Sequence, residues 1–227
     1  MKIIDQSWSF EQKPQDLLKV LEKAARTCYK SEDKIADGTA ETLLKALIRS
    51  GHHSVLEFAD ITLRIITSRS VTHELVRHRI CNFAQESQRY VKYDGEIEFI
   101  RPVWCSDVVL GVFNENYDFD IVEEYSENLF CASLWDSERA YQVLLEKGWR
   151  PEQAREVLPN STKTEILVKA NIREWRHILN LRCSMKAHPQ IRSLMRSILR
   201  EFHQEWPVLF DDLAETYSVR QLNCPRI

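Results

Sequence analysis

Glycine is scarce in this sequence, with 5 residues among 227. A Rossmann dinucleotide site needs the pattern G-x-G-x-x-G, and a phosphate-binding loop needs G-x-x-x-x-G-K-[ST]. Neither pattern occurs, and the G-x-S-x-G turn that exposes the nucleophile of many serine hydrolases is absent as well. Any dinucleotide that this protein binds must therefore be held by a fold other than the Rossmann fold.

Paired cysteines, long apolar runs and an excess of positive charge are also missing. The 6 cysteines include no C-x-x-C pair, and the N-terminal segment lacks the apolar core of a signal peptide, so we expect reduced thiols in a cytoplasmic protein. No apolar run approaches the roughly 20 residues that cross a bilayer, so we expect no membrane segment. The net charge of -3 argues against bulk nucleic-acid binding but permits a local cationic pocket.

The composition, with 44% hydrophobic and 29% charged residues, is typical of a folded globular protein. Apolar spacing predicts helices over residues 14–30, 39–51, 70–79, 118–147, 151–159, 171–182 and 189–207. Strands are predicted over 58–69 and 161–170, and the turn signal Asp94-Gly95 predicts a hairpin between 89–93 and 96–101. We expect one α/β domain over residues 1–227, in which long helices flank a central mixed or antiparallel sheet.

Two segments are candidates for a metal site or for a covalent nucleophile, and the support for each is weak. In HELVRH, His73 and His78 are five positions apart, about 140° around a helix, so they cannot share one metal on one face, and we expect no metal site. Cys81 lies two residues after Arg79, which would favour a reactive thiolate. A small buried apolar residue at a helix end is the better interpretation of Cys81.

Cationic side chains form the strongest pattern. Arg77, His78 and Arg79 would spread over a wide arc of a helix, which suits either a solvated helix end or an extended polyanion. Residues 171–182 place Asn and Arg side chains on both flanks of an apolar seam, and these planar heads suit base edges and phosphates. An ordinary amphipathic surface helix fits that segment equally well.

The segment RHRICNFAQESQRY, residues 77–90, resembles the signature of the flavin-dependent thymidylate synthases: Arg-His-Arg, seven residues and then a serine, here Ser87. AARTCYKS near the start, GHHSVLEF at 51–58, and the stretch from REVLPNSTKTEI to NIREWRHILNLR at 155–182 agree with that family in order and spacing. The resemblance covers nearly all of the chain from residue 24 to about 192.

The resemblance implies a non-Rossmann flavin-binding thymidylate synthase fold and a homotetramer with active sites at subunit interfaces. It implies methylation of dUMP to dTMP for de novo dTMP biosynthesis, with methylenetetrahydrofolate as carbon donor and FAD, reduced by NADPH, as hydride source. The family uses no cysteine nucleophile, and neither a nucleic acid nor a membrane is an expected partner.

The same resemblance implies roles for individual residues. Those expected to contact FAD are Ser54, Glu57, Arg77, His78, Arg79, Asn171, Arg173, His177 and Leu181. Those expected to bind dUMP are Glu74, Gln85, Ser87, Gln88, Arg89, Arg155 and Arg182. Catalytic roles are expected for Arg182, which would polarise the uracil carbonyl, for Ser87, and for His52 beside the folate and flavin.

Four positions depart from the family's common pattern: Phe58 replaces a frequent histidine, Glu74 a glutamine, Asn82 a serine and Ala84 an asparagine. An anionic Glu74 would repel the nucleotide's phosphate, so we expect its side chain to turn toward Arg77 or the affinity for dUMP to be lower. The competing hypothesis is a non-catalytic protein that grips nucleotides or nucleic acid with the same arginines.

Overall fold

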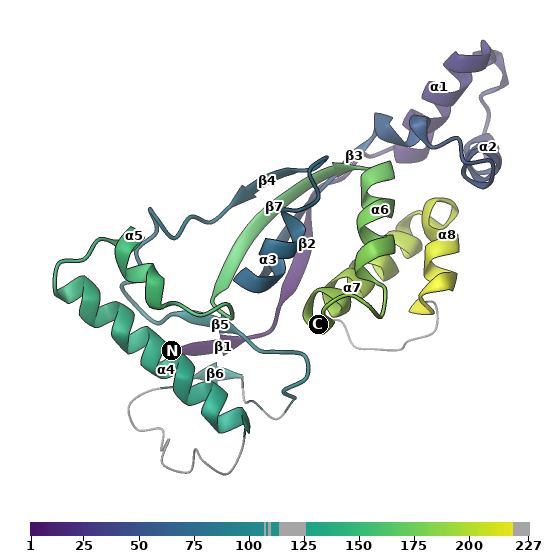
Figure 1. Ribbon diagram of the computed structural model, residues 1–227. Coiled ribbons are helices and arrows are strands. Elements are labelled where there is room, and N and C mark those ends of the chain that lie inside the picture. The colour runs from purple at the N-terminus through teal and green to yellow at the C-terminus, as the bar shows by residue number, and fades with distance from the viewer. Residues whose placement is uncertain (107, 109, 114–125, 220–227) are drawn as a thin grey trace.

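The computed structural model describes residues 1–106, 108, 110–113 and 126–219 (Figure 1). Its elements are β1 (Lys2–Ile4), β2 (Ser7–Gln12), α1 (Leu17–Tyr29), η1 (Glu32–Lys34), α2 (Thr39–Arg49), η2 (Ser54–Phe58), β3 (Asp60–Ser68), α3 (Arg69–Leu75), β4 (Asn82–Gln85), β5 (Glu98–Ile100), β6 (Gly111–Val112), α4 (Ser126–Glu146), α5 (Pro151–Ala154), η3 (Arg155–Val157), β7 (Lys163–Asn171), α6 (Ile172–Arg182), α7 (Pro189–Glu205) and α8 (Pro207–Thr216).

The larger sheet has the strand order β2-β3-β7-β4, and every neighbouring pair is antiparallel. Its two long strands pair along their whole length, from Asp60 opposite Asn171 to Ser68 opposite Lys163. Alternate residues point to opposite faces, so Ile61, Leu63 and Ile65 are buried in a core shared with α6, α7 and α8. Because α6 follows β7 directly, the pairing of β7 within this sheet fixes the position of α6 beside the core.

The other face of the larger sheet is only partly covered within one chain. Arg64 and Glu165 lie on it as an ion pair, and Ile66 and Leu167 are half-buried there. A hollow of about 350 Å³ on this face is lined in part by Arg64, Ala84 and Leu167.

The smaller sheet has the order β5-β1-β6 and pairs β1 with β5 in parallel. It packs with α4 around a second apolar cluster that includes Ile3, Phe99, Leu134 and Tyr141. The two sheets thus rest on separate cores.

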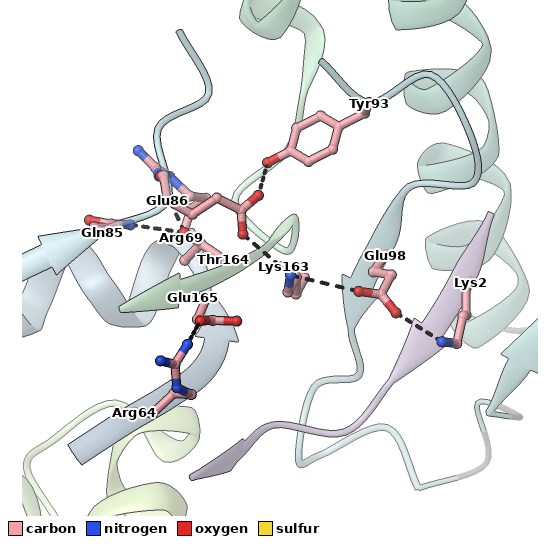
Figure 2. Close-up of polar contacts among 10 residues, drawn as sticks. All are labelled: Lys2, Arg64, Arg69, Gln85, Glu86, Tyr93, Glu98, Lys163, Thr164 and Glu165. Carbon is pink, nitrogen blue, oxygen red and sulfur yellow. Dashed lines mark hydrogen bonds and ion pairs between the residues drawn. The ribbon is translucent and has the colours of Figure 1, made fainter. Parts of the chain in front are cut away.

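A chain of charges joins the two sheets, as Figure 2 shows. Lys163 on β7 donates to Glu86 at 3.3 Å and lies 3.8 Å from Glu98 on β5, and Glu98 accepts from Lys2 on β1 at 2.9 Å. Glu86 also accepts from the hydroxyl of Tyr93 at 2.7 Å. These side chains line a hollow of about 510 Å³, and their mutual pairing fixes the β5 end of the small sheet against β7.

The α/β class with flanking long helices is confirmed, and the strands form two sheets where we expected one. The hairpin expected over 89–101 is wrong: residues 89–93 are not a strand, and β5 pairs with β1 instead. The amides of Tyr90 and Val91 donate to the carbonyl of Ser87, so this segment closes a turn and cannot join a ladder. The start of the helix expected from residue 118 lies outside the described residues, which show it from Ser126.

Among the described helices, none combines the length and the apolar character that a bilayer-crossing segment requires.

Candidate functional site

The guanidinium of Arg182, at the last residue of α6, is held by Glu74 near the end of α3 and by His78 in the turn that follows. Its Nη1 donates to Oε2 of Glu74 at 2.7 Å, and its Nη2 donates to the main-chain carbonyl of Glu74 at 3.0 Å. Its Nε donates to Nε2 of His78 at 3.1 Å. The end of α3 and the turn after it therefore lock the end of α6.

His78 is buried and neutral. Burial lowers the pKa of its imidazole to about 4, and the positive charge of Arg182 and the neighbouring His177 act in the same direction. Because Nε–H of Arg182 can only donate, Nε2 of His78 must accept, which places the ring proton on Nδ1. That Nδ1 faces the carboxylate of Glu174 at 3.6 Å.

Glu174 is a residue of this site that the sequence patterns did not reveal. It lies on the first turn of α6, where its amide donates to the side chain of Asn171 at 2.9 Å, and its own carboxyl is buried. Burial raises the pKa of that carboxyl. One feature of the sequence could have revealed Glu174. It is an acidic residue among the apolar residues Trp175 and Ile178, and a charge buried at such a position requires a hydrogen-bonding or charged partner.

His78, Glu174 and His177 bring one ligand-type atom each within 4.8 Å of one another. This group is poorly suited to a metal ion, because Nδ1 of His78 carries the proton and Nε2 receives the Arg182 N–H. A positively charged guanidinium 3.1 Å from the ring would also repel a cation. The three side chains form a hydrogen-bonding support for Arg182 instead.

Three arginines that were expected to contact FAD are exposed on the segments that carry this support. Arg77 and Arg79 are exposed beyond the end of α3, and Arg173 is exposed on the first turn of α6. Arg173 donates to Glu57 at 2.5 Å, which ties η2 to α6. The exposed His177 packs its ring edge-to-face on His78, with centroids 5.9 Å apart.

Large apolar side chains are exposed in the same segments as these cations. The exposed fractions are 69% for Phe58, 73% for Ile80, 47% for Leu181 and 71% for Met185. Apolar side chains beside cations suit a ligand or partner that offers both flat apolar surface and negative charge.

The other residues of the flavin group, and His52, have simpler surroundings. Asn171 caps α6 through its side chain, which accepts from Glu174. Ser54 is exposed at the start of η2, and η2 packs against α6. His52 is exposed in the loop between α2 and η2.

The residues at the end of β4 that were expected to bind dUMP are partly engaged in contacts within the protein. Gln85 donates to Thr72 at 3.0 Å and to Thr164 at 3.2 Å, so it points to the core side of the sheet (Figure 2 shows the Thr164 contact). The hydroxyl of Ser87 accepts the amide N–H of Arg89 at 3.3 Å and so shapes the turn. The amide nitrogen of Gln88 is buried and has no hydrogen-bond partner in the part of the chain that the structure describes.

Arg89 and Arg155 form the basis of a second cationic group. The side chain of Arg89 lies 3.7 Å from Glu152 on α5, and Arg155 follows that helix at the start of η3. No hydrogen bond or ion pair among the described residues links either arginine to Arg182. In Figure 1, α5 lies near the start of β7 and α6 follows the end of that strand, so one chain does not bring the expected dUMP residues together.

Two structural expectations at this site were wrong: that Glu74 turns toward Arg77, and that the Arg77-His78-Arg79 triplet lies on a helix. A lower affinity for dUMP, the other alternative given for Glu74, stays a prediction. Glu74 turns toward Arg182, because the end of α6 delivers a guanidinium to within 2.7 Å of its carboxylate, whereas Arg77 is exposed. The Arg77-His78-Arg79 triplet does not continue a helix, because α3 ends at Leu75 and the following residues form turns. This turn separates the buried His78 from the two exposed arginines.

Alkylation by iodoacetamide at pH 8 is expected to modify Cys28 and to spare Cys81 and Cys183 in the folded protein. Cys28 is exposed, whereas burial raises the pKa of both Cys81 and Cys183 to about 12. At that pKa only about one thiol in 10⁴ is ionised at pH 8. Peptide mass spectrometry with and without urea measures the difference, and rapid labelling of native Cys81 would contradict it.

The chain matches a known protein family and several of its members. A family model described as "Thymidylate synthase complementing protein" matches residues 11–208. A "Flavin-dependent thymidylate synthase" from Corynebacterium aurimucosum is 35% identical over 212 residues, which cover 92% of this chain and 85% of that protein. Proteins of the same name from Corynebacterium efficiens and Geobacter sulfurreducens are 38% identical over 198 residues (85% of this chain, 78% of that protein) and 36% over 196 (83% and 78%).

A similar arrangement is also found among solved structures. The structure of "a UMP/dUMP methylase PolB from Streptomyces cacaoi bound with 5-Br dUMP" matches with a TM-score of 0.74 at 24% identity. The match covers 96% of this chain and 99% of that one, and at this identity it shows a shared fold.

Proposed function

Because the chain belongs to the flavin-dependent thymidylate synthases, a family of methyltransferases, we propose that it converts dUMP to dTMP. In this proposal methylenetetrahydrofolate supplies the carbon, and FAD, reduced by NADPH, supplies the hydride. The observation that carries the proposal is Arg182, a guanidinium fixed on one side by Glu74 and His78 and only half-buried on the other. Family membership favours an enzyme over the non-catalytic binding protein.

The residues around α6 fit FAD. Its diphosphate needs cations and hydrogen-bond donors, which the exposed Arg77, Arg79 and Arg173 offer. Its ring system needs apolar surface, and Leu181 is exposed one residue before Arg182. We propose that these residues, with Ser54, Glu57, Asn171 and His177, hold the flavin, while the buried His78 contributes through its neighbours.

The chain's own contribution to the reaction is to bind dUMP and to polarise its base. Arg182 would donate to a uracil carbonyl and so stabilise negative charge that develops on the ring. Arg89 and Arg155 would hold the phosphate, and the buried Gln88 amide would find in the nucleotide the acceptor that the described chain does not supply. Ser87 keeps the turn in place, and His52 would face the folate.

We propose that no cysteine acts as nucleophile. Cys81 lies two residues after Arg79 and Cys183 directly follows Arg182, and the pKa of about 12 that burial gives each thiol keeps both protonated at neutral pH. For Cys81, the carboxylate of Glu174 raises the pKa further.

A complete nucleotide site requires a second copy of the chain in this proposal. Within one chain, Arg155 and Arg182 are not in contact, and α5 and α6 lie near opposite ends of β7 (Figure 1). We therefore propose active sites at subunit interfaces of a homotetramer, in which the partly covered face of the larger sheet and exposed residues such as Ile80 would be buried. Each subunit would be one domain over residues 1–227, acting in the cytoplasm.

The test is an absorbance spectrum of the purified protein, followed by dUMP-dependent oxidation of NADPH and chromatography of the nucleotide product. Flavin bands together with dTMP formation that requires methylenetetrahydrofolate are the expected result. A protein that stays colourless with added FAD, or that binds oligonucleotides in a salt-sensitive way without turnover, would overturn the proposal and support the non-catalytic alternative.

A further inference from the structure

The contact between Glu74 and Arg182 carries an inference that rests on the proposed function and goes beyond it. We infer that Glu74 is a positioning residue: it fixes the guanidinium of Arg182 for the base of the nucleotide and keeps that guanidinium from the phosphate. The notion that an acidic residue at this position weakens dUMP binding does not follow once its partner is known.

The contacts that Arg182 makes within the protein determine which of its N–H groups remain for a ligand. A guanidinium has five N–H groups. One goes to the carboxylate of Glu74, one to the carbonyl of Glu74 and one to His78. Two N–H groups, one on each Nη, are therefore left, and they lie in the same plane in a fixed relation to each other. This matches a planar acceptor such as a uracil edge better than a freely rotating arginine would.

The support is rigid on both sides of the guanidinium. On one side, the carboxylate and the carbonyl of the same residue, Glu74, grip two nitrogens. On the other side, neutral His78 accepts from Nε while its Nδ1 faces Glu174. His177 is the remaining titratable group packed on this ring. The side chains of Arg182 and Glu74 are 20% and 30% exposed, so the pair is shielded but accessible at its edge.

The charge of Glu74 determines what the two free N–H groups attract. A guanidinium that already pairs with a carboxylate has most of its charge compensated locally, so it gains less from a phosphate dianion. It remains a good hydrogen-bond donor toward a neutral carbonyl. Arg89 and Arg155 pair with carboxylates only at 3.7 and 3.8 Å and remain the better partners for phosphate. Glu74 would thus help to set the direction in which the nucleotide lies.

The experiment compares Glu74→Ala and Glu74→Gln with wild type in the complete, flavin-loaded enzyme. Alanine releases the guanidinium, so kcat for dTMP formation should fall by about 10-fold to 100-fold, while KM for dUMP changes by less than about threefold. Glutamine keeps an oxygen that accepts from Nη1, so kcat should return to within about fivefold of wild type. Glu205→Ala, which breaks the remote Lys13–Glu205 ion pair, is the matched control and should leave both constants unchanged.

A binding measurement distinguishes the effect of Glu74 on recognition of the base from its effect on recognition of the phosphate. By calorimetry, Glu74→Ala should lose about 10-fold in affinity for deoxyuridine, which has no phosphate, and gain affinity for inorganic phosphate as a competitor. The two effects offset each other in dUMP, because the released guanidinium can pair with its phosphate, and KM for dUMP therefore changes little. In the double variant Glu74→Ala/Arg182→Ala, loss of Glu74 should cost nothing further, because it acts through Arg182.

Several outcomes decide the inference. Wild-type kcat in Glu74→Ala, equal impairment in Glu74→Ala and Glu74→Gln, or additive losses in the double variant would each overturn it. Should Glu74→Ala not fold, Glu74→Asp withdraws the carboxylate by one methylene and gives the same test. A wild-type protein that forms no dTMP refutes the proposed function, yet the deoxyuridine affinities still test the positioning of Arg182.

Discussion

Replacement of Arg182 by alanine should lower dTMP formation by at least about 100-fold and leave FAD uptake intact, because a preorganised donor at a developing oxyanion is worth a factor of this size. The guanidinium reaches the site from the end of α6 and is held there by Glu74 and His78. No other arginine of the described chain shares those contacts. Its loss would remove the stabilisation of charge on the ring without disturbing the exposed cations assigned to the flavin.

Single-turnover kinetics with pre-reduced enzyme measures this loss apart from flavin reduction, and the flavin spectrum shows whether the cofactor is retained. Arg192→Ala is the matched control, since Arg192 is also half-buried, and among the described residues its guanidinium donates to the main-chain carbonyls of Met185 and Ala187. A full rate in Arg182→Ala, or loss of FAD without loss of rate per bound flavin, would show that Arg182 does not act on the nucleotide.

The elements that could be predicted from the sequence are those with strong local periodicity. The α1, α2, α6 and α7 helices and the two long strands β3 and β7 bury one stripe or one face over 9 to 17 residues, and that contrast is visible in the sequence. The strands β1, β2, β4 and β6 were not predicted, nor was α8. Three residues in β1 and two in β6 are too few to show a period.

The failed hairpin has a different cause. Asp94-Gly95 is a turn signal, but the partner of β5 is β1 at the N-terminus, where Phe99 lies opposite Ile3. A turn signal in the sequence predicts where the chain reverses direction, but it does not predict with which strand the following segment pairs. Sequence separation likewise hid the support of Arg182: Glu74 and His78 are 108 and 104 positions away from it.

The motif places three cationic or titratable side chains next to one another in the sequence, but their exposure follows only from the structure. Arg77, His78 and Arg79 are adjacent in sequence and similar in chemistry, yet His78 is buried with a neutral ring whereas both arginines are exposed. That difference arises because α3 ends two residues earlier, and a turn points neighbouring side chains in different directions. No composition or spacing rule conveys it.

Acidification should destabilise the protein through His78 before most carboxylates titrate. The pKa of His78 is about 4 in the folded chain against 6.5 as the ordinary value, because of burial and the charge of Arg182. Between these values the unfolded chain binds a proton that the folded chain does not, so the free energy of unfolding falls as pH decreases from 6.5 toward 4. The full effect of this one group is about 3 kcal/mol.

Glu174 opposes this trend, because burial raises the pKa of its carboxyl and the folded chain takes up that proton more readily than the unfolded chain. Urea unfolding at fixed protein concentration should therefore show a net loss of about 1–3 kcal/mol between pH 6.5 and 4.5. His78→Gln should flatten this dependence, and Glu174→Gln should steepen it, because each removes one of the two opposing proton equilibria. An unchanged pH dependence in His78→Gln would mean that the ring is not held neutral, and the hydrogen bond that orients Arg182 would then need another explanation.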